Sequence, residues 1–397
     1  MDDPLIIDCL RTPIGRFGGE LSSVRPDDLA ALVLRRLVER VGLDPKELED
    51  VYLGCANQAG EDNRNVARMA ALLAGFPVEV GGCTVNRLCG GGLEAVLDAA
   101  RAIWHGDGRA MIGGGVESMS RSPWAVPKPE RGFARGERVM YDTALGWRFV
   151  NPKMEERYGT DSMGETAENV ARMFSIPREP QDRFALRSHQ KAVSAQDRGA
   201  FADELVPVET RAGTVSQDEG PRRDTSLEKL AQLRPAFAKD GTVTAGNSST
   251  LNDGAAAVLL TSAEFAGEHG LRPMAVLRGM AVAAVPPRIM GIGPVDATRK
   301  ALGRAHLALD QIQLIELNEA FSAQSLAVLQ ELEVDPEDER LNPNGGAIAL
   351  GHPLGCSGAR ILTTLLHEMG RRQLQFGLAT MCIGVGQGIA AVVERLS

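Results

Sequence analysis

Two parts of this sequence repeat the same order of strand and helix signals, and this repeat limits the fold more than any other feature. In the first half, an apolar strand at 5–10 is followed by a helical pattern at 28–41 and by a strand at 48–53. The matching segments of the second half are a strand, a helix and a strand at 274–283, 295–305 and 309–317.

Each half then continues with a turn of small residues, a helix and a glycine-rich strand end. These segments are 89–104 and 109–118 in the first half, and 355–369 and 377–388 in the second. Apolar residues recur at helical spacing in both helices: Leu93, Val96, Leu97, Ala100 and Trp104, and Ile361, Leu362, Leu365, Leu366 and Met369. We therefore predict two α/β halves whose mostly parallel sheets are covered by helices, with an active site where the halves meet.

Residues 121–245, between the halves, have a different composition. The part from 121 to 160 is rich in Pro and Gly and holds eight Lys or Arg against five Asp or Glu, in a chain whose net charge is −9. The local positive charge favours a cap over an anionic ligand or a contact with another subunit, and an ordinary surface excursion is the alternative. The overall negative charge argues against nucleic acid as the partner.

Targeting signals and cysteine spacing bear on where the protein works. No run of about 18 apolar residues is present, so we expect no membrane-spanning helix. The acidic start lacks the basic residues of a secretory signal, and the chain does not end in Ser-Lys-Leu. The six cysteines lack paired metal-ligand spacing, so we expect free thiols, no metal site and a cytoplasmic protein.

Cys89 is followed by Gly90, Gly91 and Gly92 and then by a helical pattern. The positive end of a helix dipole favours the thiolate, which makes such a cysteine reactive at neutral pH. We interpret the glycines as opening the approach of a bulky substrate to the sulfur. This predicts a cysteine nucleophile, although a cysteine beside glycines is more often buried packing.

His352 and Asn318 are two further candidates. Pro353 favours an extended backbone at His352, which would project the imidazole from a strand end, where it could deprotonate Cys89. A structural or solvated histidine is the alternative. Asn318 follows a strand, and a buried amide there could hold a water or donate to an oxyanion. Capping of the next helix is the other interpretation of Asn318.

The last strand carries a second thiol, Cys382, and glycines at alternating positions, Gly384, Gly386 and Gly388. The backbone N–H groups of these glycines could bind an oxyanion. No helix opens after them and no acidic residue follows about 20 positions later, so we exclude a dinucleotide-binding site.

Together, Cys89, His352 and Cys382 in glycine settings and Asn318 in NEAF resemble the thiolase family of coenzyme A acyltransferases. The resemblance extends through RTPIGRFGG, VESMS, TAGN and CIGVGQG. It implies an α/β fold with a duplicated five-layer α/β/α/β/α core and an inserted loop domain. The implied ranges are 1–120 with 246–272 for the N-terminal half, 121–245 for the loop domain that covers coenzyme A, and 273–397 for the C-terminal half.

The resemblance also implies a role for each site residue. Cys89 would carry the acyl group, His352 would activate it, and Cys382 would move the proton at the α-carbon. His352 with a water on Asn318 would stabilise the enolate, and the N–H groups of Cys89 and Gly384 would hold the other oxyanion. The implied reaction is thiolytic cleavage of a 3-oxoacyl-CoA, or the reverse condensation of acetyl-CoA, with no tightly bound cofactor.

Contacts with the acyl-CoA substrate are implied for three further residues. Ser249 in TAGNSS matches a serine that contacts pantetheine, and Arg222 is a weaker match for the nucleotide end. Met163 would line the acyl pocket. The implied assembly is a homodimer, often paired into a homotetramer.

Four segments resemble the 3-oxoadipyl-CoA thiolases of aromatic-compound breakdown: GRFGGELSSVRPDDLAA, GCANQAGEDNRNVARMA, GWRFVNP and MGIGPV. Ser162 takes the place of the histidine that is usual in short-chain acetoacetyl-CoA thiolases, which would make room for a longer acyl chain. A dicarboxylic substrate would need a cation or polar anchor, which the sequence alone does not identify. A short-chain acetoacetyl-CoA thiolase is the alternative.

Two departures from the family pattern predict an altered substrate range. Gly91 lacks the usual serine hydroxyl, which would loosen the helix start, and Thr250 stands where glycine is common. Rival functions are a decarboxylating condensing enzyme, a cysteine hydrolase and a catalytically weak acyl-CoA-binding protein. Cys382 and the NEAF segment favour a thiolase over the condensing enzyme, and a hydrolase has no use for a second thiol. The binding protein is disfavoured because Cys89, His352, Asn318 and Cys382 are all intact.

Overall fold

The computed structural model describes residues 3–130, 132–133 and 135–396, so the outermost residues of the two predicted halves, and 131 and 134 in the predicted loop domain, lie outside the described residues. The N-terminal half builds one part of a large sheet. Its strands are β1 (Leu5–Arg11), β2 (Gly15–Arg16), β3 (Asp50–Gly54), β4 (Cys83–Val85), β5 (Ala110–Ser118) and β10 (Asn252–Thr261). Its helices are α1 (Pro26–Val41), α2 (Val66–Leu73), α3 (Gly91–His105) and α8 (Ala263–Glu268).

The C-terminal half repeats this plan. Its strands are β11 (Ala275–Ala284), β12 (Leu314–Leu317), β13 (Phe376–Ile383) and β14 (Gln387–Arg395). Its helices are α9 (Gly293–Ala305), α10 (Ser322–Glu331), α11 (Ala347–Leu350) and α12 (Leu354–Arg372). Short 3-10 helices connect elements in both halves: η1 (Pro45–Glu47), η2 (Leu88–Gly90), η3 (Pro287–Ile292) and η4 (Leu309–Gln311).

The strand order confirms the duplication. The sheet runs β12-β13-β14-β11-β1-β10-β5-β3-β4, with β2 beside β10. A parallel bridge between Ile315 and Leu341 stands beside β12, in the place that β4 takes beside β3. The halves join where Leu5 and Ile6 of β1 pair with Val276 and Ala275 of β11.

The prediction of mostly parallel sheets is wrong. Only β3–β4, β3–β5 and β12–β13 pair in parallel among the described strands of the large sheet, while β10 and β14 run antiparallel to both of their main neighbours. Antiparallel neighbours need no crossover helix. The chain therefore turns directly from β13 into β14, at the glycines that follow Cys382.

Apolar side chains form three layers that alternate with the two halves of the sheet. One lies under α1 and α2, one surrounds α3 and α12 between the halves, and one lies under α9 and α10. This gives the five-layer arrangement expected. Every apolar residue predicted on α12 is buried, but Trp104, in the last turn of α3, is 45% exposed.

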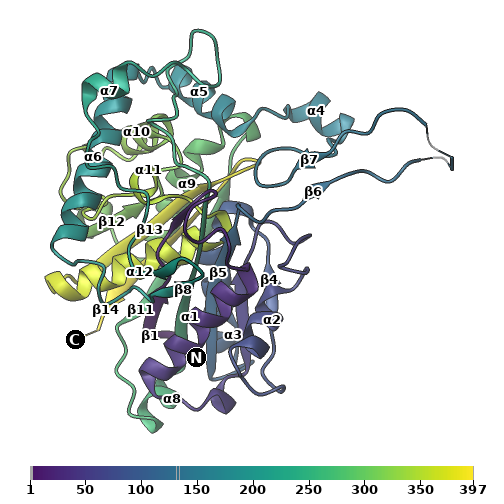
Figure 1. Ribbon diagram of the computed structural model, residues 1–397. Coiled ribbons are helices and arrows are strands. Elements are labelled where there is room, and N and C mark those ends of the chain that lie inside the picture. The colour runs from purple at the N-terminus through teal and green to yellow at the C-terminus, as the bar shows by residue number, and fades with distance from the viewer. Residues whose placement is uncertain (1–2, 131, 134, 397) are drawn as a thin grey trace.

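The segment at 121–245 packs against both halves, since Val206 and Val208 join the apolar layer under α1 and Phe184 joins the layer under α9. Its elements are β6 (Trp124–Ala125), β7 (Tyr141–Asp142), α4 (Pro152–Tyr158), α5 (Met163–Met173), α6 (Arg178–Asp197), β8 (Val208–Thr210), β9 (Gly213–Val215) and α7 (Leu227–Ala231). β6, β7 and α4 extend away from the body as an arm (Figure 1). No helix in the described part of the chain is long and apolar enough to cross a bilayer.

A buried ion-pair cluster attaches this segment to β1. The Arg11 guanidinium lies 2.6 Å from a carboxylate oxygen of Glu204 and 2.7 Å from one of Asp218, and all three side chains are fully buried. Because the carboxylates outweigh the cost of burial, they raise the pKa of Arg11 far above its usual range. The clamp fixes the inserted segment against the N-terminal half and so helps to shape the space between them.

Candidate active site

A cavity of about 400 Å³ lies between the two halves and the inserted segment. Six of the eight predicted site residues line it: Cys89, Met163, Ser249, His352, Cys382 and Gly384. Asn318 is buried at the end of β12, two residues before Ala320 of the cavity wall. Arg222 is exposed and lies outside the lining, where its backbone N–H donates to Nδ1 of His189 at 3.2 Å.

Cys89 lies in the 3-10 turn η2, directly before α3 begins at Gly91. The preceding residue, Leu88, has a φ of 45°, which is costly for a residue with a side chain. The side chain of Asn86 holds this turn by accepting from the Leu88 N–H at 3.0 Å. The strained turn directs the Cys89 side chain into the cavity before the chain continues as a buried helix.

The three glycines after Cys89 serve packing, so the interpretation that they open the approach of a substrate is wrong. A Cβ at Gly92 would lie 2.5 Å from the carbonyl oxygen of Gly355 on α12. A Cβ at Gly90 would meet the side chain of Ile383 at 2.5 Å. A Cβ at Gly91 would lie 3.2 Å from the Cα atom of Gly54 on β3. The glycines let α3 approach α12 and the sheet closely, which brings Cys89 close to the start of α12.

The Cys89 thiol is protonated at rest, so the expected thiolate is not formed by the helix end alone. Burial raises the pKa of Cys89 above its ordinary value, although hydrogen bonds from the backbone of Gly384 and from its own backbone act in the opposite direction. The desolvation cost therefore outweighs the dipole and N–H contributions. A base must remove the proton when substrate arrives.

His352 lies in the connection between α11 and α12, so the predicted position at a strand end is wrong. Its backbone N–H donates to Oδ1 of Asn252 at 2.9 Å, and the Thr250 hydroxyl donates to the same oxygen at 2.8 Å. The threonine that departs from the family pattern therefore helps to hold the backbone of His352.

The imidazole of His352 is fixed as a neutral base. Burial and, to a smaller extent, the positive charge of Arg360 lower the pKa of His352 to about 3. Nδ1 lies 2.6 Å from Oγ of Ser357, and the Ser357 hydroxyl donates to the carbonyl of Pro353 at 2.9 Å. Since Ser357 uses its proton there, Nδ1 must carry the ring proton, and Nε2 keeps the lone pair that can accept one.

Cys382 lies near the end of β13 and is almost completely buried. Burial, and then the negative charge that Cys89 would carry, raise the pKa of Cys382 far above its ordinary value. The second thiol thus holds its proton firmly until an equally strong base forms beside it.

The Asn318 amide is completely buried, and neither its oxygen nor its nitrogen has a hydrogen-bond partner among the described residues. The N-cap of α10 is Phe321, without a side-chain cap, so Asn318 does not cap that helix. Buried polar groups are costly unless they are hydrogen-bonded, and they commonly bind water. This supports the interpretation of Asn318 as a holder of water or of a substrate oxygen.

Met163 at the start of α5 and Ser249, just after the inserted segment, complete the cavity wall. Ser162 and Glu165 form a capping box at the start of α5, which places Met163 in the first turn, facing Gly384. The backbone N–H of Ser249 donates to the carbonyl of Ala320 at 2.9 Å, which ties the chain leaving the segment to the NEAF stretch.

The sequence reasoning missed two charged residues of the wall, Glu117 and Arg148. Glu117 accepts hydrogen bonds from the backbone N–H groups of Ala56, Asn57 and Gly355, at 2.9, 3.1 and 2.8 Å. Burial nevertheless raises the pKa of Glu117 to about 7. Both residues lie in segments that carry the family resemblance, VESMS and GWRFVNP. A charged side chain among apolar neighbours is the feature that could have marked each of them as a site residue.

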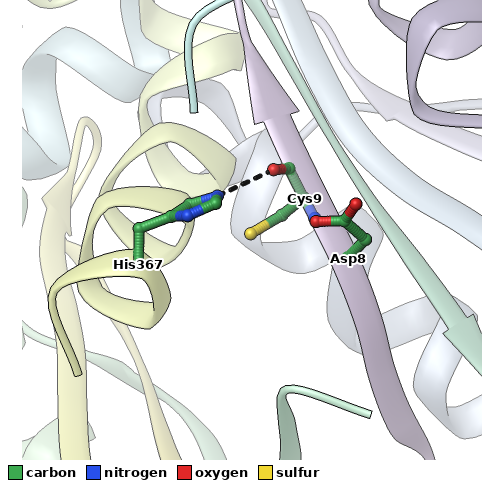
Figure 2. Close-up of side chains that lie close together, drawn as sticks. All are labelled: Asp8, Cys9 and His367. Carbon is green, nitrogen blue, oxygen red and sulfur yellow. Dashed lines mark hydrogen bonds between the residues drawn. The ribbon is translucent and has the colours of Figure 1, made fainter. Parts of the chain in front are cut away.

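A cluster outside the cavity has the residue types of a metal site. Candidate ligand atoms of Asp8, Cys9 and His367 lie within 4.8 Å of one another. Nε2 of His367 is 3.0 Å from the backbone carbonyl of Cys9 (Figure 2), and the Arg40 guanidinium donates to the Asp8 carboxylate at 2.6 Å. Burial raises the pKa of the Cys9 thiol well above its ordinary value. These groups already have partners that join α12, β1 and α1, so we assign them to packing.

A protonated thiol, a neutral imidazole and a second thiol around one cavity are the groups with which an enzyme can transfer acyl groups through cysteine. Models of the N-terminal and C-terminal domains of thiolase match residues 5–264 and 271–395. The chain therefore belongs to the thiolase family and is an acyltransferase that uses coenzyme A thioesters as substrates.

Individual relatives agree with this assignment. A beta-ketoadipyl-CoA thiolase of Pseudomonas aeruginosa is 57% identical over 98% of both chains. A 3-oxoadipyl-CoA/3-oxo-5,6-dehydrosuberyl-CoA thiolase of Escherichia coli K12 is 56% identical over 100% of both chains. The crystal structure of the Bacillus anthracis acetyl-CoA acetyltransferase matches with a TM-score of 0.93 and 45% identity, covering 100% of this chain and 99% of that one.

Proposed function

We propose that this thiolase cleaves 3-oxoadipyl-CoA with free coenzyme A to give acetyl-CoA and succinyl-CoA. The names of the Pseudomonas aeruginosa and Escherichia coli relatives support this substrate. The observation that carries the mechanism is that Cys89, His352, Cys382 and Gly384 all line one cavity.

In the first half of the reaction, Nε2 of His352 takes the Cys89 proton and the sulfur attacks the C3 carbonyl of the substrate. The N–H groups of Cys89 and Gly384 stabilise the resulting oxyanion, a contribution typically of about 10²- to 10³-fold in rate for one donor. The C2–C3 bond then breaks. The leaving enolate, stabilised by His352 and a water on Asn318, takes the proton of Cys382 and departs as acetyl-CoA.

In the second half, the Cys382 thiolate takes the proton of free coenzyme A. The coenzyme A sulfur attacks the succinyl thioester on Cys89, and succinyl-CoA leaves. The Cys89 sulfur recovers its proton from His352, so both thiols and the imidazole return to their starting states. The high pKa of Cys382 suits this role, because its thiolate is a strong base.

We propose the domain boundaries in the same way: 1–120 with 246–272, 121–245 and 273–397. In this scheme the segment at 121–245 covers coenzyme A, Ser249 contacts pantetheine, and Met163 lines the acyl end. Ser249 and Met163 support this, because both line the cavity. The exposed position of Arg222 is compatible with a contact to the nucleotide end, which extends into solvent.

We also propose a cytoplasmic homodimer that pairs into a homotetramer. Large apolar side chains are exposed on the arm around β6 and β7, where Trp124 is 65% and Val139 62% exposed. β4, at the end of the strand order, has a free edge in the described part of the sheet. Light scattering on the eluting protein should give the mass of two or four chains, and a monomer would contradict this assembly.

The test of the substrate is steady-state thiolysis with free coenzyme A, comparing 3-oxoadipyl-CoA with acetoacetyl-CoA. We expect a higher kcat/KM for 3-oxoadipyl-CoA. A preference for acetoacetyl-CoA would instead support a short-chain thiolase, the alternative favoured by the likeness to the acetyl-CoA acetyltransferase of Bacillus anthracis. Absence of turnover with both substrates would support an acyl-CoA-binding protein.

A further inference from the structure

The wall of the Cys89 cavity is largely apolar and has one basic side chain. Its lining includes Leu145, Met290 and Val385. Among the described residues of the lining, only Glu117 and Arg148 are acidic or basic, apart from the neutral His352. The Glu117 carboxylate is held by three backbone N–H groups. Arg148 is thus the one cation available to a ligand from this wall.

The Arg148 guanidinium is partly buried and has no hydrogen-bond or ion-pair partner among the described residues. Arg11 and Arg178, by contrast, each pair with carboxylates. A guanidinium offers five N–H donors in a planar fork that matches a carboxylate. An unpaired guanidinium in a cavity wall is therefore suited to an anionic group of the ligand.

The loop that leads to Arg148 is held at two points before the arginine. The Trp147 indole donates to the carbonyl of Asp161 at 3.2 Å, which links it to the start of α5 beside Met163. Thr143 accepts from the Asn57 amide at 2.8 Å and donates to the carbonyl of Pro123 at 2.5 Å. The arginine is thus presented from a fixed loop, which lowers the entropic cost of using it.

We propose that Arg148 determines specificity by binding the terminal carboxylate of 3-oxoadipyl-CoA, and of the succinyl group that Cys89 then carries. This inference rests on the proposed function. A carboxylate that enters a largely apolar cavity must find a charged partner to offset its lost hydration. No other lining residue that the structure describes can supply a positive charge. The phosphates of coenzyme A are the other source of anionic oxygen, and the experiment must separate the two.

The test uses two substrates of equal chain length, 3-oxoadipyl-CoA and 3-oxohexanoyl-CoA, which differ in having a carboxylate or a methyl group at the end. The measured quantity is the ratio of their kcat/KM values in thiolysis. We expect Arg148→Gln to lower the ratio by about 10- to 100-fold, mainly through a higher KM for 3-oxoadipyl-CoA. Arg148→Lys should keep part of the preference, since it retains the charge but loses the fork.

Arg157→Gln is the matched control. Arg157 is exposed on α4, so this substitution removes the same charge at a position outside the cavity. It should leave the ratio unchanged. If Arg148→Gln lowers kcat/KM equally for both substrates, the arginine serves the coenzyme A phosphates and the proposal is wrong. If the wild-type enzyme prefers 3-oxoadipyl-CoA and Arg148→Gln leaves the ratio unchanged, only the role of Arg148 is overturned. A wild-type enzyme without that preference overturns the proposed function as well.

Discussion

The Nδ1 atom of His352 and the Oγ atom of Ser357 lie 2.6 Å apart, and this contact determines which ring nitrogen acts as the base. The Ser357 hydroxyl donates its proton to the carbonyl of Pro353, so its oxygen can only accept a hydrogen bond from Nδ1. The contact therefore leaves Nε2 without a proton, in the cavity that Cys89 also lines. It joins the first turn of α12 to a histidine of the preceding connection, so in the proposed mechanism the state of the base depends on how that helix begins.

Replacing Ser357 with alanine should lower kcat by about 10-fold with little change in KM, because the imidazole loses its fixed tautomer but not its place. The control is Thr363→Val, which removes another buried α12 hydroxyl, one that donates to the carbonyl of Ala359 at 2.9 Å. Steady-state thiolysis by both variants gives the comparison. If the two substitutions lower kcat equally, the Ser357 hydroxyl only stabilises the helix and does not fix the tautomer of His352.

Alkylation of Cys89 by iodoacetamide should accelerate steadily as the pH rises from 6 to 9. Below the pKa of a thiol, the thiolate fraction grows about tenfold for each pH unit, and burial places the pKa of Cys89 above its ordinary value. The neutral His352 does not change its charge in this range, since its pKa is about 3. Rapid alkylation with a plateau below pH 7 would show a resting thiolate and contradict the account. Peptide mapping separates Cys89 from the exposed Cys83.

Cys382→Ala should still accept an acyl group on Cys89 but fail to form or cleave the carbon–carbon bond. The reason is that acylation by acetyl-CoA breaks only a C–S bond, and the coenzyme A thiolate can exchange its proton with water when Cys382 is absent. The proton at C2, by contrast, has no other carrier in the proposed mechanism. Exchange of labelled coenzyme A into acetyl-CoA measures the first reaction, and acetoacetyl-CoA formation measures the second. Normal condensation by this variant would remove Cys382 from its role.

Gly92→Ala should destabilise the fold by about 1–3 kcal/mol, because the new Cβ would press on the carbonyl of Gly355. Gly303→Ala is the matched control on α9, where a Cβ meets nothing within 4 Å. That substitution should be neutral or stabilising by up to about 1 kcal/mol, since alanine favours the helix. Thermal unfolding of both variants tests the difference, and equal midpoints would show that α3 and α12 do not need the glycine.

Much of the fold could be predicted from local patterns. The strand at β1, the helices α1, α3, α9 and α12, and their repetition in both halves all appear where apolar periodicity indicated them. Periodicity does not report strand direction. The chain passes from β13 to β14 through a short turn, and β10 pairs with β5 only after the inserted segment. Neither pair is a strand–helix–strand repeat, so the sequence pattern did not indicate that these strands are antiparallel.

The residues of the site were found because their side chains are chemically distinctive, but their states depend on contacts between distant segments. Cys89 is kept protonated by burial that comes from both halves. The tautomer of His352 depends on Ser357, which carries no sequence signal of its own. Arg148 is one of several basic residues in its segment, and only the structure shows that, of those it describes, Arg148 alone lines the cavity.

The most direct test of the account is to mix the enzyme with 3-oxoadipyl-CoA in the absence of free coenzyme A and to map the modified peptides by mass spectrometry. The account predicts one succinyl group on Cys89 and release of an equal amount of acetyl-CoA. Release of free coenzyme A without a stable adduct would indicate a hydrolase, and an adduct on any other residue would contradict the assignment of Cys89 as the nucleophile.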